Sequence, residues 1–563
     1  YEGLYPEDAR TKIVKEMEGL ELLDKVERHS HQVGHSERTD AIVQPYISKQ
    51  WFMNMEKLTE PALKAVKNCQ INFYPERWTK TYNHWLENIR DWCISRQLWW
   101  GHRIPVWYRE DEIYCGTTPP VGDGWQQDED VLDTWFSSWL WPFATLGWPD
   151  ETNDLKDFYP TQSIVTGPDI IFFWVARMIM AGIYFRDEIP FSNVCFNGII
   201  RDEKGRKMSK SLGNSPDPVE LMDEYGSDAL RVGILMIAPT GLDILFSKDK
   251  IEHGRNFVNK LWNSARFILM NKDKNFRISS DFNLIEGTTN IDRWIVSRLE
   301  TSIGKIDKYY NQYRLNDALK TVYDFTRKDF CDWYIEFAKI RLYGDDPMDR
   351  EVAFQVSSYV LRNILKLLHP FAPFVTEELW SYLKTDKEDM ILTESYPMQD
   401  IDLVSDSIEE EVEIVKNIIS SVRNVRADLN IPPSKEADLA VRVNSKVSDL
   451  FDLYQNQIKR LARVGTIAFG KDIKKPRKSA TAVVDGIEIF IPLEGLIDLE
   501  AEIKRLEKQI DDMQARLDNV NKKLGNENFV SRAPKEVIRN ERDKQKRYRD
   551  NLDKLKANLN SLI

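Results

Sequence analysis

The chain has 563 residues, 42 % of them hydrophobic and 30 % charged, and a formal net charge of −12. Its length exceeds a single domain and its apolar content is sufficient for several buried cores. The acidic balance excludes binding to nucleic acid over the whole surface, so such a contact must use local basic patches. The five cysteines include no Cys-x-x-Cys pair, so we expect neither a zinc site nor a disulfide framework, and a reducing cytoplasm fits.

The start of the chain and its longest apolar stretch bear on targeting. The chain begins at Tyr1 without a signal-like segment, and we expect it to be part of a longer protein. The stretch Ile164–Phe185 contains Asp169 and Arg177 together with turn-forming residues. A buried strand and helix therefore fit this stretch better than a membrane span.

The first half of the chain shows α/β character. A region rich in Trp and Arg precedes a Gly/Pro/Thr loop at Gly116–Gly124. Beyond it, apolar runs and turn signals predict strands at Ser163–Thr166 and Val194–Ile200, with a helix at Ile170–Tyr184 between them. Asp217, followed by a proline, is typical of a helix start. This order of elements predicts part of a parallel α/β sheet.

From about Ile251 the apolar residues recur at three- and four-residue spacing, which predicts helices. Prolines then interrupt the pattern, and Thr376 is a candidate cap for a following helix. We expect a helical bundle built from four predicted runs: Phe257–Leu269, Trp294–Tyr310, Leu315–Tyr343 and Val352–Leu368.

The C-terminal part combines a small mixed module with a long amphipathic segment. A helical pattern at Glu409–Leu429 precedes strand-like Ala437–Val443 and Ala480–Ile491. Beyond these, apolar residues from Leu499 to Leu524 follow a heptad pattern that resumes after a loop. An antiparallel two-helix hairpin explains this better than a dimeric coiled coil, which stays the alternative. Leu496–Ile563 has 16 basic and 13 acidic residues, a mildly basic balance that suits contact with a nucleic-acid backbone.

The string KMSKSLGN at Lys207–Asn214 carries two lysines with hydroxyl side chains beside them. Gly205 and Gly213 give the backbone freedom on both sides. Mobile ammonium groups next to hydroxyl and amide donors suit a polyphosphate whose charge moves outward as pyrophosphate leaves. The alternative for a generic lysine-rich loop is a solvated basic turn.

Two further stretches are candidates for a site. In the first, Gly167 follows a predicted strand and allows close approach to the backbone, while Asp169 at the helix start is placed to accept hydrogen bonds from ribose hydroxyls. The alternative is that Asp169 simply caps the helix. Ile170 and Trp174 are four residues apart on one helix face, which forms either a pocket wall or ordinary core. The second stretch is Asp130–Ser138, which by itself indicates only the aromatic end of a strand.

Taken together and in this order, these strings resemble those of valyl-tRNA synthetases, a class I aminoacyl-tRNA synthetase family. The resemblance extends over essentially the whole chain. Isoleucyl- and leucyl-tRNA synthetases are relatives, but their Trp-rich stretches differ and the isoleucyl enzyme usually ends in a zinc module. The strings that carry the resemblance are SKQWF (Ser48–Phe52), WCISRQLWWGHRIPVWY (Trp92–Tyr108), DVLDTWFSS (Asp130–Ser138), TGPDIIFFWVARM (Thr166–Met178), RDEKGRKMSKSLGN (Arg201–Asn214) and YGSDALR (Tyr225–Arg231).

The resemblance implies an α/β plus mainly α architecture in five parts. These are a return segment from an inserted editing domain at residues 1–47, the C-terminal half of a Rossmann catalytic domain at 48–250, a helical anticodon-binding domain at 251–400, a small α+β module at 401–495, and a C-terminal antiparallel coiled-coil arm at 496–563.

The resemblance also implies a function and a set of site residues. The family is a valine–tRNA ligase that uses valine, ATP with Mg²⁺, and tRNA-Val, and a cytoplasmic monomer without zinc or membrane contact is expected. Lys207 and Lys210 correspond to the catalytic signature lysines that stabilise the ATP phosphates. The nucleotide-binding residues are Gly167, Asp169, Lys207, Met208, Ser209, Lys210 and Ser211, and the valine pocket is walled by Trp135, Ile170 and Trp174.

One signature of the family is missing from the sequence. Class I sites need a His-x-Gly-His string, and His31–His35 has one residue too many, while His102 belongs to the GHRIP string. We therefore expect a chain without the first Rossmann half and most of the editing domain, which does not activate valine by itself. The alternative function is a tRNA-binding module without catalysis. Its candidate phosphate contacts are Arg532, Lys535, Arg539, Arg542, Lys546, Arg547 and Arg549.

Overall fold

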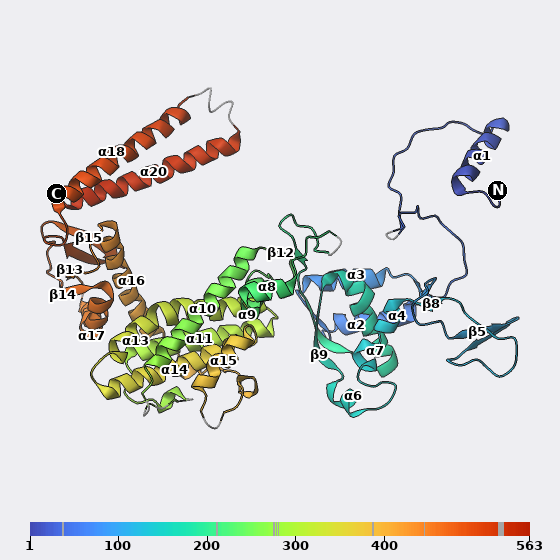
Figure 1. The fold of residues 1–563 in the computed structure, drawn as a ribbon, viewed down its shortest axis with the longest axis horizontal. Helices are drawn as coiled ribbons and strands as arrows, with labels where there is room; N and C mark the ends of the chain where they lie inside the picture. The colour runs from blue at the N-terminus through green and yellow to red at the C-terminus, as the bar shows by residue number, and fades with distance from the viewer. Residues whose placement is uncertain are drawn as a thin grey trace. The chain divides into compact units, whose positions relative to one another are not determined.

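The structure is a computed structural model that describes residues 1–36, 39–209, 212–273, 276, 278–279, 281–385, 388–443, 445–526 and 534–562. The chain divides into two compact units. Unit 1 comprises Tyr1–Glu60 and Asn88–Leu140, and unit 2 comprises Pro61–Glu87 and Trp141–Ile563. Each unit is described by itself, with the elements labelled in Figure 1.

Unit 1 is built from short strands and few helices. Three small antiparallel sheets pair β1 with β3, β4 with β8, and β5 with both β6 and β7. Its elements are α1 (Pro6–Gly19), β1 (Phe52–Met53), the first turn of α2 (Glu56–Lys67), β3 (Trp92–Cys93), β4 (Ser95–Arg96), β5 (Val106–Arg109), β6 (Glu112–Cys115), β7 (Gln126–Gln127), β8 (Val131–Leu132) and α4 (Thr134–Ser138).

Two carboxylates organise the aromatic residues of unit 1. Asp128 accepts hydrogen bonds from the Trp51 indole (2.9 Å) and the Tyr108 hydroxyl (2.7 Å). Asp133 accepts from the Trp92 indole (3.2 Å) and pairs with the Arg96 guanidinium. The Trp-rich stretch noted in the sequence is thus held by polar contacts as well as by apolar packing, because buried indole N–H groups need acceptors.

Unit 2 begins with the predicted parallel sheet. Its strand order is β2–β10–β9, and both pairs are parallel. Its elements are the rest of α2, β2 (Asn72–Tyr74), α3 (Arg77–Glu87), α5 (Trp141–Ala144), α6 (Asn153–Phe158), β9 (Thr161–Thr166), a 3₁₀ turn (Pro168–Ile170), a π-helix (Ile171–Val175), α7 (Ala176–Arg186), β10 (Phe191–Phe196), β11 (Ile200–Arg201), α8 (Pro218–Tyr225), α9 (Ser227–Met236) and β12 (Ile244–Leu245).

The predicted helix and second strand of this region need correction. The helix expected at Ile170–Tyr184 is a 3₁₀ turn, a π-helix and then α7. The strand expected at Val194–Ile200 is divided into β10 and β11. Gly198 lies at the break, where a Cβ would be 1.6 Å from the Leu242 carbonyl oxygen. A side chain there would force the two backbone segments apart, so the break depends on glycine.

The apolar stretch Pro168–Arg186 is long and apolar enough to cross a membrane by length and composition alone. In the structure, all residues of α7 from Ala176 to Gly182 are buried within the protein. This burial fits the predicted strand-and-helix unit, since a core helix of a globular domain has the same composition.

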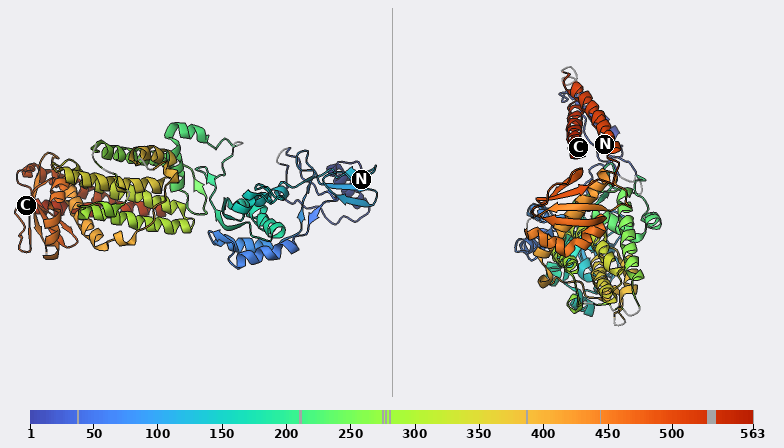
Figure 2. Two further views of the ribbon diagram at one scale, coloured as in Figure 1. Left: turned by 90° about the horizontal axis from the view of Figure 1, so that it is seen from below. Right: turned by 90° about the vertical axis from the view of Figure 1, so that its left-hand side faces the viewer.

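The helical bundle belongs to a large core of unit 2 that continues into the small module after it, and its helices lie roughly alongside one another in Figure 1 and in the left view of Figure 2. All four predicted helical runs are present. The elements are α10 (Lys248–Met270), α11 (Asn290–Asn311), α12 (Leu315–Asp324), a π-helix (Phe325–Tyr334), α13 (Ile335–Leu342), α14 (Pro347–Leu368) and α15 (Pro373–Leu383), with 3₁₀ turns at Phe282–Leu284, Ile391–Thr393 and Ile401–Leu403.

A buried carboxylate joins the α/β part to the bundle. Asp228, near the start of α9, is 6 % exposed, and its two oxygens accept the main-chain N–H groups of Phe374 (3.3 Å) and Val375 (2.6 Å). Arg231, one turn later, donates to the main-chain carbonyls of residues 370 and 371 (3.0 and 3.1 Å). Asp228 therefore caps α15 from outside the bundle, and satisfies N–H groups that have no partner within the helix.

This contact corrects the expectation for Thr376. The sequence suggested that Thr376 caps the helix, but α15 begins at Pro373, and Thr376 lies inside it with its hydroxyl donating to the carbonyl of Ala372 (2.8 Å). A capping side chain that comes from a segment about 145 residues away in the sequence leaves no local signal. By residue propensity alone, a threonine at this place favours a local cap.

The small module combines two helices with a four-stranded sheet in the order β14–β13–β16–β15. Asp485 and Gly486, both with positive φ, form the turn between the last two strands, as a two-residue hairpin requires. The sequence predicted strands at Ala437–Val443 and Ala480–Ile491, but the second stretch is two strands, β15 and β16, and neither α17 nor β14 was predicted. The elements are α16 (Asp406–Asp428), β13 (Ala437–Arg442), α17 (Ser445–Ala462), β14 (Val464–Gly470), β15 (Ser479–Val484) and β16 (Ile487–Pro492).

The chain ends in two long helices, α18 (Leu499–Leu524) and α20 (Lys535–Leu562), that lie side by side in Figures 1 and 2. Leu506, Leu517, Val520 and Leu552 are buried. Gln545 of α20 donates to Asn521 of α18 (2.7 Å). The apolar seam read from the sequence thus supplies the contact face between these helices.

We predict that replacing Glu300 by Gln removes a pH-dependent loss of stability. Glu300 is 2 % exposed, accepts the Asp400 N–H (2.8 Å), and burial raises its pKa to about 7. Because the folded state binds this proton more tightly than the unfolded state, wild-type stability falls between pH 5 and pH 8, by at most about 3 kcal/mol. Gln keeps an acceptor for Asp400 without a charge.

The measurement is urea unfolding of wild type and Glu300→Gln at pH 5, 7 and 8, with the exposed Glu410→Gln as the matched control. The Glu300 variant should be more stable than wild type at pH 8 and closer to it at pH 5, whereas the control follows wild type. An equal pH dependence in all three proteins would contradict the assignment.

Candidate functional site

The first part of the candidate site is the turn that follows β9. Thr166 ends the strand, and its carbonyl accepts the Asn197 N–H (3.1 Å) from the neighbouring strand's end. Gly167 then starts the 3₁₀ turn, and a Cβ there would lie 2.7 Å from an Asp169 carboxylate oxygen. Glycine at this position therefore makes room for the carboxylate of Asp169, which the sequence assigned to a ribose.

The second part is the lysine loop, which starts from a tight hairpin after β11. Arg201 and Lys207 form an antiparallel bridge, and Asp202 and Gly205 close the turn with a main-chain hydrogen bond of 2.8 Å. Gly205 has φ +77°, a conformation that favours glycine. β11 itself pairs in parallel with β12, so the loop is attached to regular structure at its start.

Two side chains hold the ends of the loop together. Asp202 accepts the Arg206 N–H (2.8 Å) and the Asn214 amide (3.0 Å). Asn214 accepts the Ser209 N–H (2.9 Å) and donates to the Lys207 carbonyl (3.3 Å). We name Asp202 and Asn214 the loop clasp. The hydrogen bond from the Asn214 amide, and to a smaller extent those from the Arg206 N–H groups, hold the pKa of Asp202 well below its usual range. The carboxylate is therefore charged at neutral pH.

Among the described residues, the two parts meet at an ion pair. Lys207 Nζ lies 3.2 Å from an Asp169 carboxylate oxygen, and both side chains are partly exposed. Residues 38 positions apart in the sequence are thus adjacent in space. Met208 and Ser209 are half-buried beside them. Lys210 and Ser211, which the sequence also assigned to this site, lie outside the described residues.

The proposed pocket wall is distributed over both units. In unit 2, Ile170 ends the 3₁₀ turn and Trp174 lies in the π-helix, with its ring in an edge-to-face contact with Trp141 (6.3 Å between centroids). The two are therefore not on one regular α-helical face, as the sequence suggested. Trp135 lies in α4 of unit 1, where its main-chain N–H donates to Asp133 (2.9 Å). A pocket that combines all three residues stays a prediction.

The basic residues assigned to RNA contact lie on α20. Arg539, Arg542, Lys546 and Arg549 recur at spacings of three, four and three, and are all exposed. This spacing places them on one face of the helix. Arg547 is exposed but falls outside this stripe. Arg532 and the side chain of Lys535 lie outside the described residues.

The bundle holds a polar pocket of about 550 Å³ between α10 and the π-helix at Phe325–Tyr334. Asn256, Asn259 and Asn263 of α10 line it and form no side-chain hydrogen bonds with the residues that the structure describes. Lys260 pairs with Asp332 across the pocket. Asparagine is a poor helix former, so three amides on an exposed helix face that borders a π-helix make this face a candidate binding surface.

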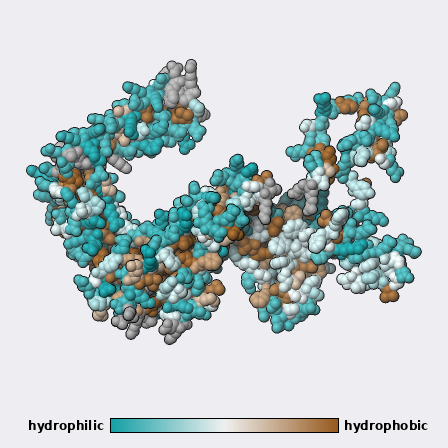
Figure 3. Space-filling view, in the orientation of Figure 1, coloured by the Kyte–Doolittle hydropathy of each residue, from teal (hydrophilic) through white to brown (hydrophobic). Residues whose placement is uncertain are grey.

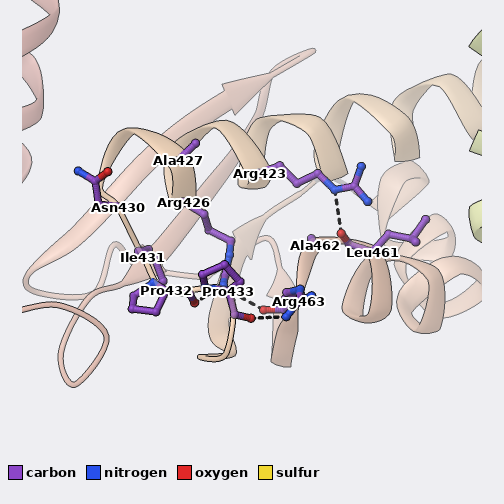
Figure 4. A pocket seen from close by; sticks show the side chains of 10 residues that line it. All are labelled: Arg423, Arg426, Ala427, Asn430, Ile431, Pro432, Pro433, Leu461, Ala462 and Arg463. Atoms are coloured by element: carbon purple, nitrogen blue, oxygen red, sulfur yellow. Dashed lines mark hydrogen bonds between the residues drawn. The ribbon is translucent and has the colours of Figure 1, made fainter. Parts of the chain in front are cut away.

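A second pocket, of about 520 Å³, lies in the small module and is lined by three arginines (Figure 4). Arg426 donates to the carbonyls of Arg463, Pro432 and Lys435. Arg423 donates to the Leu461 carbonyl (2.8 Å) near the end of α17. These guanidinium groups satisfy main-chain carbonyls at helix ends, a structural role that needs no ligand.

Within the described part of the chain, no group of three or more His, Cys, Asp or Glu side chains is arranged to hold a metal ion.

The loop clasp is the functional feature that sequence reasoning missed. Asp202 and Asn214 were both part of the quoted string, but neither was given a role. Asp202 lies three residues before Gly205, and Asn214 lies at the far end of the loop. Asp and Asn at such positions are typical of turns in which a side chain bonds to the main chain, so this pattern could have identified both residues.

We predict that Asp202→Ala opens the loop. The substitution leaves the Arg206 N–H and the Asn214 amide without their charged acceptor. Hydrogen exchange at the Arg206 and Ser209 amides should therefore be at least about tenfold faster than in wild type. The matched control is Glu203→Ala, a neighbouring exposed acid in the same turn. Equal exchange in the two variants would refute the clasp.

Comparison with known families gives three matches along the chain. Residues 11–119 and 120–247 match the family of class I tRNA synthetases for I, L, M and V. Residues 292–441 match the anticodon-binding domain of tRNA ligase. Residues 498–563 match the valyl tRNA synthetase tRNA binding arm.

Individual relatives agree with these matches. The valine–tRNA ligase of Staphylococcus carnosus is 44 % identical over all of this chain, which covers 65 % of that protein. The valine–tRNA ligase of Halalkalibacterium halodurans is 46 % identical over all of this chain, which covers 64 % of it. The chain thus spans about two thirds of the length of these relatives.

Among solved structures, Mycobacterium tuberculosis methionyl-tRNA synthetase in complex with methionyl-adenylate matches with a TM-score of 0.50 and 20 % identity, over 62 % of this chain and 65 % of that one. At this identity the likeness concerns the fold. The family matches and the relatives show that the chain belongs to the class I tRNA synthetases, among the valine–tRNA ligases.

Proposed function

We propose that this chain contributes part of the active site of a valine–tRNA ligase, and that the whole protein joins valine to tRNA-Val at the expense of ATP. The observation that carries the proposal is the ion pair between Lys207 and Asp169, which brings the lysine loop to the nucleotide-binding turn. Either stretch alone has a structural explanation, whereas their contact places the lysine loop beside the turn, as the binding of one nucleotide triphosphate by both stretches requires.

In the proposed reaction the valine carboxylate attacks the α-phosphate of ATP, the bond to the β-phosphate breaks, and pyrophosphate leaves. Asp169 holds the ribose hydroxyls, and Gly167, which has no side chain, lets the nucleotide approach the main chain. Lys207, with Lys210, stabilises the negative charge that accumulates on the leaving pyrophosphate. Mg²⁺ enters as the ATP complex. A terminal ribose hydroxyl of the tRNA then attacks the carbonyl of the valyl-adenylate and releases AMP.

Selection of valine would depend on the aromatic wall. Trp135, Ile170 and Trp174 would exclude larger side chains by size. Size selection in an apolar pocket gives about 1–3 kcal/mol per methylene and distinguishes poorly between valine and the similarly shaped threonine. An editing site is therefore needed for accuracy, and we expect none in residues 48–563.

The chain contains no His-x-Gly-His string. In the family this string assists ATP, so we propose that the lysine loop needs a further segment, in the same protein or supplied by another chain, to become active. A cytoplasmic location and a monomeric state are part of the same proposal.

We predict that the 563-residue chain by itself does not catalyse valine-dependent ATP–pyrophosphate exchange. The lysine loop and the nucleotide-binding turn are present, but the His-x-Gly-His string is not. The α-phosphate of ATP therefore lacks some of the residues that would position it. The measurement compares the purified chain with its Lys207→Ala and Lys210→Ala variants. Exchange that is present in wild type and lost in either variant would show that these residues build a complete site, and would overturn the prediction.

A second function, tRNA binding without catalysis, is favoured by two independent features. One is the asparagine-lined pocket in the bundle, since amides donate and accept hydrogen bonds and suit the edges of unpaired bases. The other is the stripe of four exposed cations on α20, which suits a phosphate backbone. The two functions are compatible, because a ligase also holds its tRNA.

We predict that the α20 stripe contributes salt-dependent affinity for tRNA-Val. Changing Arg542, Lys546 and Arg549 together to Gln removes three phosphate contacts. The slope of log K against log salt should then become less negative by about 2 to 3. The assay is filter binding of a tRNA-Val transcript at 50–300 mM KCl. Changing Arg10, Lys12 and Lys15 of α1 to Gln is the control for net charge. Unchanged slopes in the α20 variant would remove this helix from the interface.

A further inference from the structure

The loop between β14 and β15 is the most strongly basic short segment that the proposed function does not use. Residues 471–478 read KDIKKPRK, with five cations and one acid. This net charge of +4 over eight residues stands in a chain whose overall net charge is −12. We name residues 471–478 the basic strap. The sequence reading did not single it out.

The path of the strap follows from the sheet register. β14 runs parallel to β13 and lies at one edge, whereas β15 lies at the other edge and runs in the same direction as β14. The chain leaves β14 at Gly470, at one end of the sheet, and enters β15 at Ser479, at the opposite end. The strap must therefore pass over the sheet from one edge to the other in eight residues, in an extended form.

The strap crosses the face that α16 and α17 leave open. Those helices pack with Ala437, Leu439 and Val441 in the main core. Arg442 is on the other face of β13, since side chains alternate along a strand. Its guanidinium lies over the ring of Phe490 (5.4 Å), while its Nε donates to the strap carbonyl of Ile473 (2.8 Å). This second face is thus the one beneath the strap.

Main-chain contacts fix the strap and leave its cations outward. Besides the Ile473 contact, the Ser479 hydroxyl donates to the Pro476 carbonyl (2.6 Å) and the Leu493 N–H to the Lys478 carbonyl (3.0 Å). Ile473 and Pro476 are half-buried. The five cationic side chains are exposed, and none is paired with a carboxylate of the described residues. They are Lys471, Lys474, Lys475, Arg477 and Lys478.

This arrangement differs from that of the arginines in the small-module pocket and in the bundle. The arginines of the Figure 4 pocket are occupied by main-chain carbonyls. Arg298 and Arg341 of the bundle pair with carboxylates. The strap instead presents like charges on a braced backbone. Their mutual repulsion lowers stability unless an anionic partner offsets it.

The position of the strap identifies the kind of partner. Lys478 leads directly into β15, against which α20 packs. The strap therefore lies beside the base of the two long helices, whose exposed surface is largely hydrophilic in Figure 3. A polyanion that follows the cationic stripe of α20 toward the base of the hairpin reaches the strap next.

We propose that the basic strap binds the phosphate backbone of an RNA, as a second contact region on the small module beside the α20 stripe. Evenly exposed lysines without aromatic neighbours suit phosphates rather than bases, so the strap adds affinity and position without sequence preference. This inference deepens the proposed tRNA binding and, for the identity of the RNA, rests on it.

The experiment measures RNA binding by the full chain and a strap variant in which Lys474, Lys475 and Arg477 are changed to Gln. A charge-preserving variant exchanges them for Arg, Arg and Lys. The control for net charge is the α1 triple variant described above. The probes are a tRNA-Val transcript, an unrelated RNA hairpin of similar length, and vesicles of phosphatidylcholine with 30 % phosphatidylserine, each at 50–300 mM KCl.

The strap variant should lower the salt slope for tRNA-Val by about 2 to 3 and weaken binding at least tenfold at 100 mM salt, whereas the charge-preserving and α1 variants should match wild type. An affinity and slope equal to wild type would overturn the proposal, as would strap-dependent binding to the vesicles without an effect on RNA. Strap-dependent binding of both RNAs with equal affinity would support the strap and count against the proposed tRNA-Val function. A failure of the strap proposal is therefore distinguishable from a failure of the proposed tRNA-Val function.

Discussion

The hydrogen bonds between Asp228 and the first turn of α15 are the constraint on which the arrangement of unit 2 depends. Asp228 is buried, and burial raises its pKa while the N–H groups of Val375 and Phe374 oppose that rise. A carboxylate in such a place is stable only while both N–H groups face it. The segment that follows the lysine loop is thus fixed to the bundle at one point, and Arg231 fixes it at a second.

This constraint gives a physical meaning to the string YGSDALR. Gly226 has φ +95° and allows the chain to turn directly from α8 into α9. Asp228 and Arg231, one turn apart on α9, then contact the bundle with opposite charges. The Asp is aimed at a helix N-terminus and the Arg at the carbonyls just before it, which is the favourable orientation for each. Asn316 adds a third connection by donating to the carbonyls that end α9.

The sequence predicted those parts of the fold whose signals are local or periodic. The parallel pairing of β9 and β10, the bundle helices and the cap at Asp217 all follow from spacing and turn residues. The two π-helices were not predicted, because their wider hydrogen-bond pattern leaves no distinct apolar period, and both lie at candidate binding surfaces. The cap of α15 and the order of strands in the small module depend on residues distant in sequence. In the site, the lysine string and Gly167 were recognisable from sequence. The two residues of the loop clasp had a local turn pattern that could have identified them, whereas the Lys207–Asp169 contact joins residues distant in sequence and needed the structure.

The Lys207–Asp169 pair has a consequence for how the loop responds to a nucleotide. Both side chains are substantially exposed, at 63 % and 46 %, and an ion pair in such a setting contributes less than about 1 kcal/mol. The contact by itself therefore holds the loop only weakly. In the proposed function, a triphosphate that offers Lys207 a denser negative charge would replace Asp169 as its partner at little cost, so that the binding energy would remain available for the chemical step.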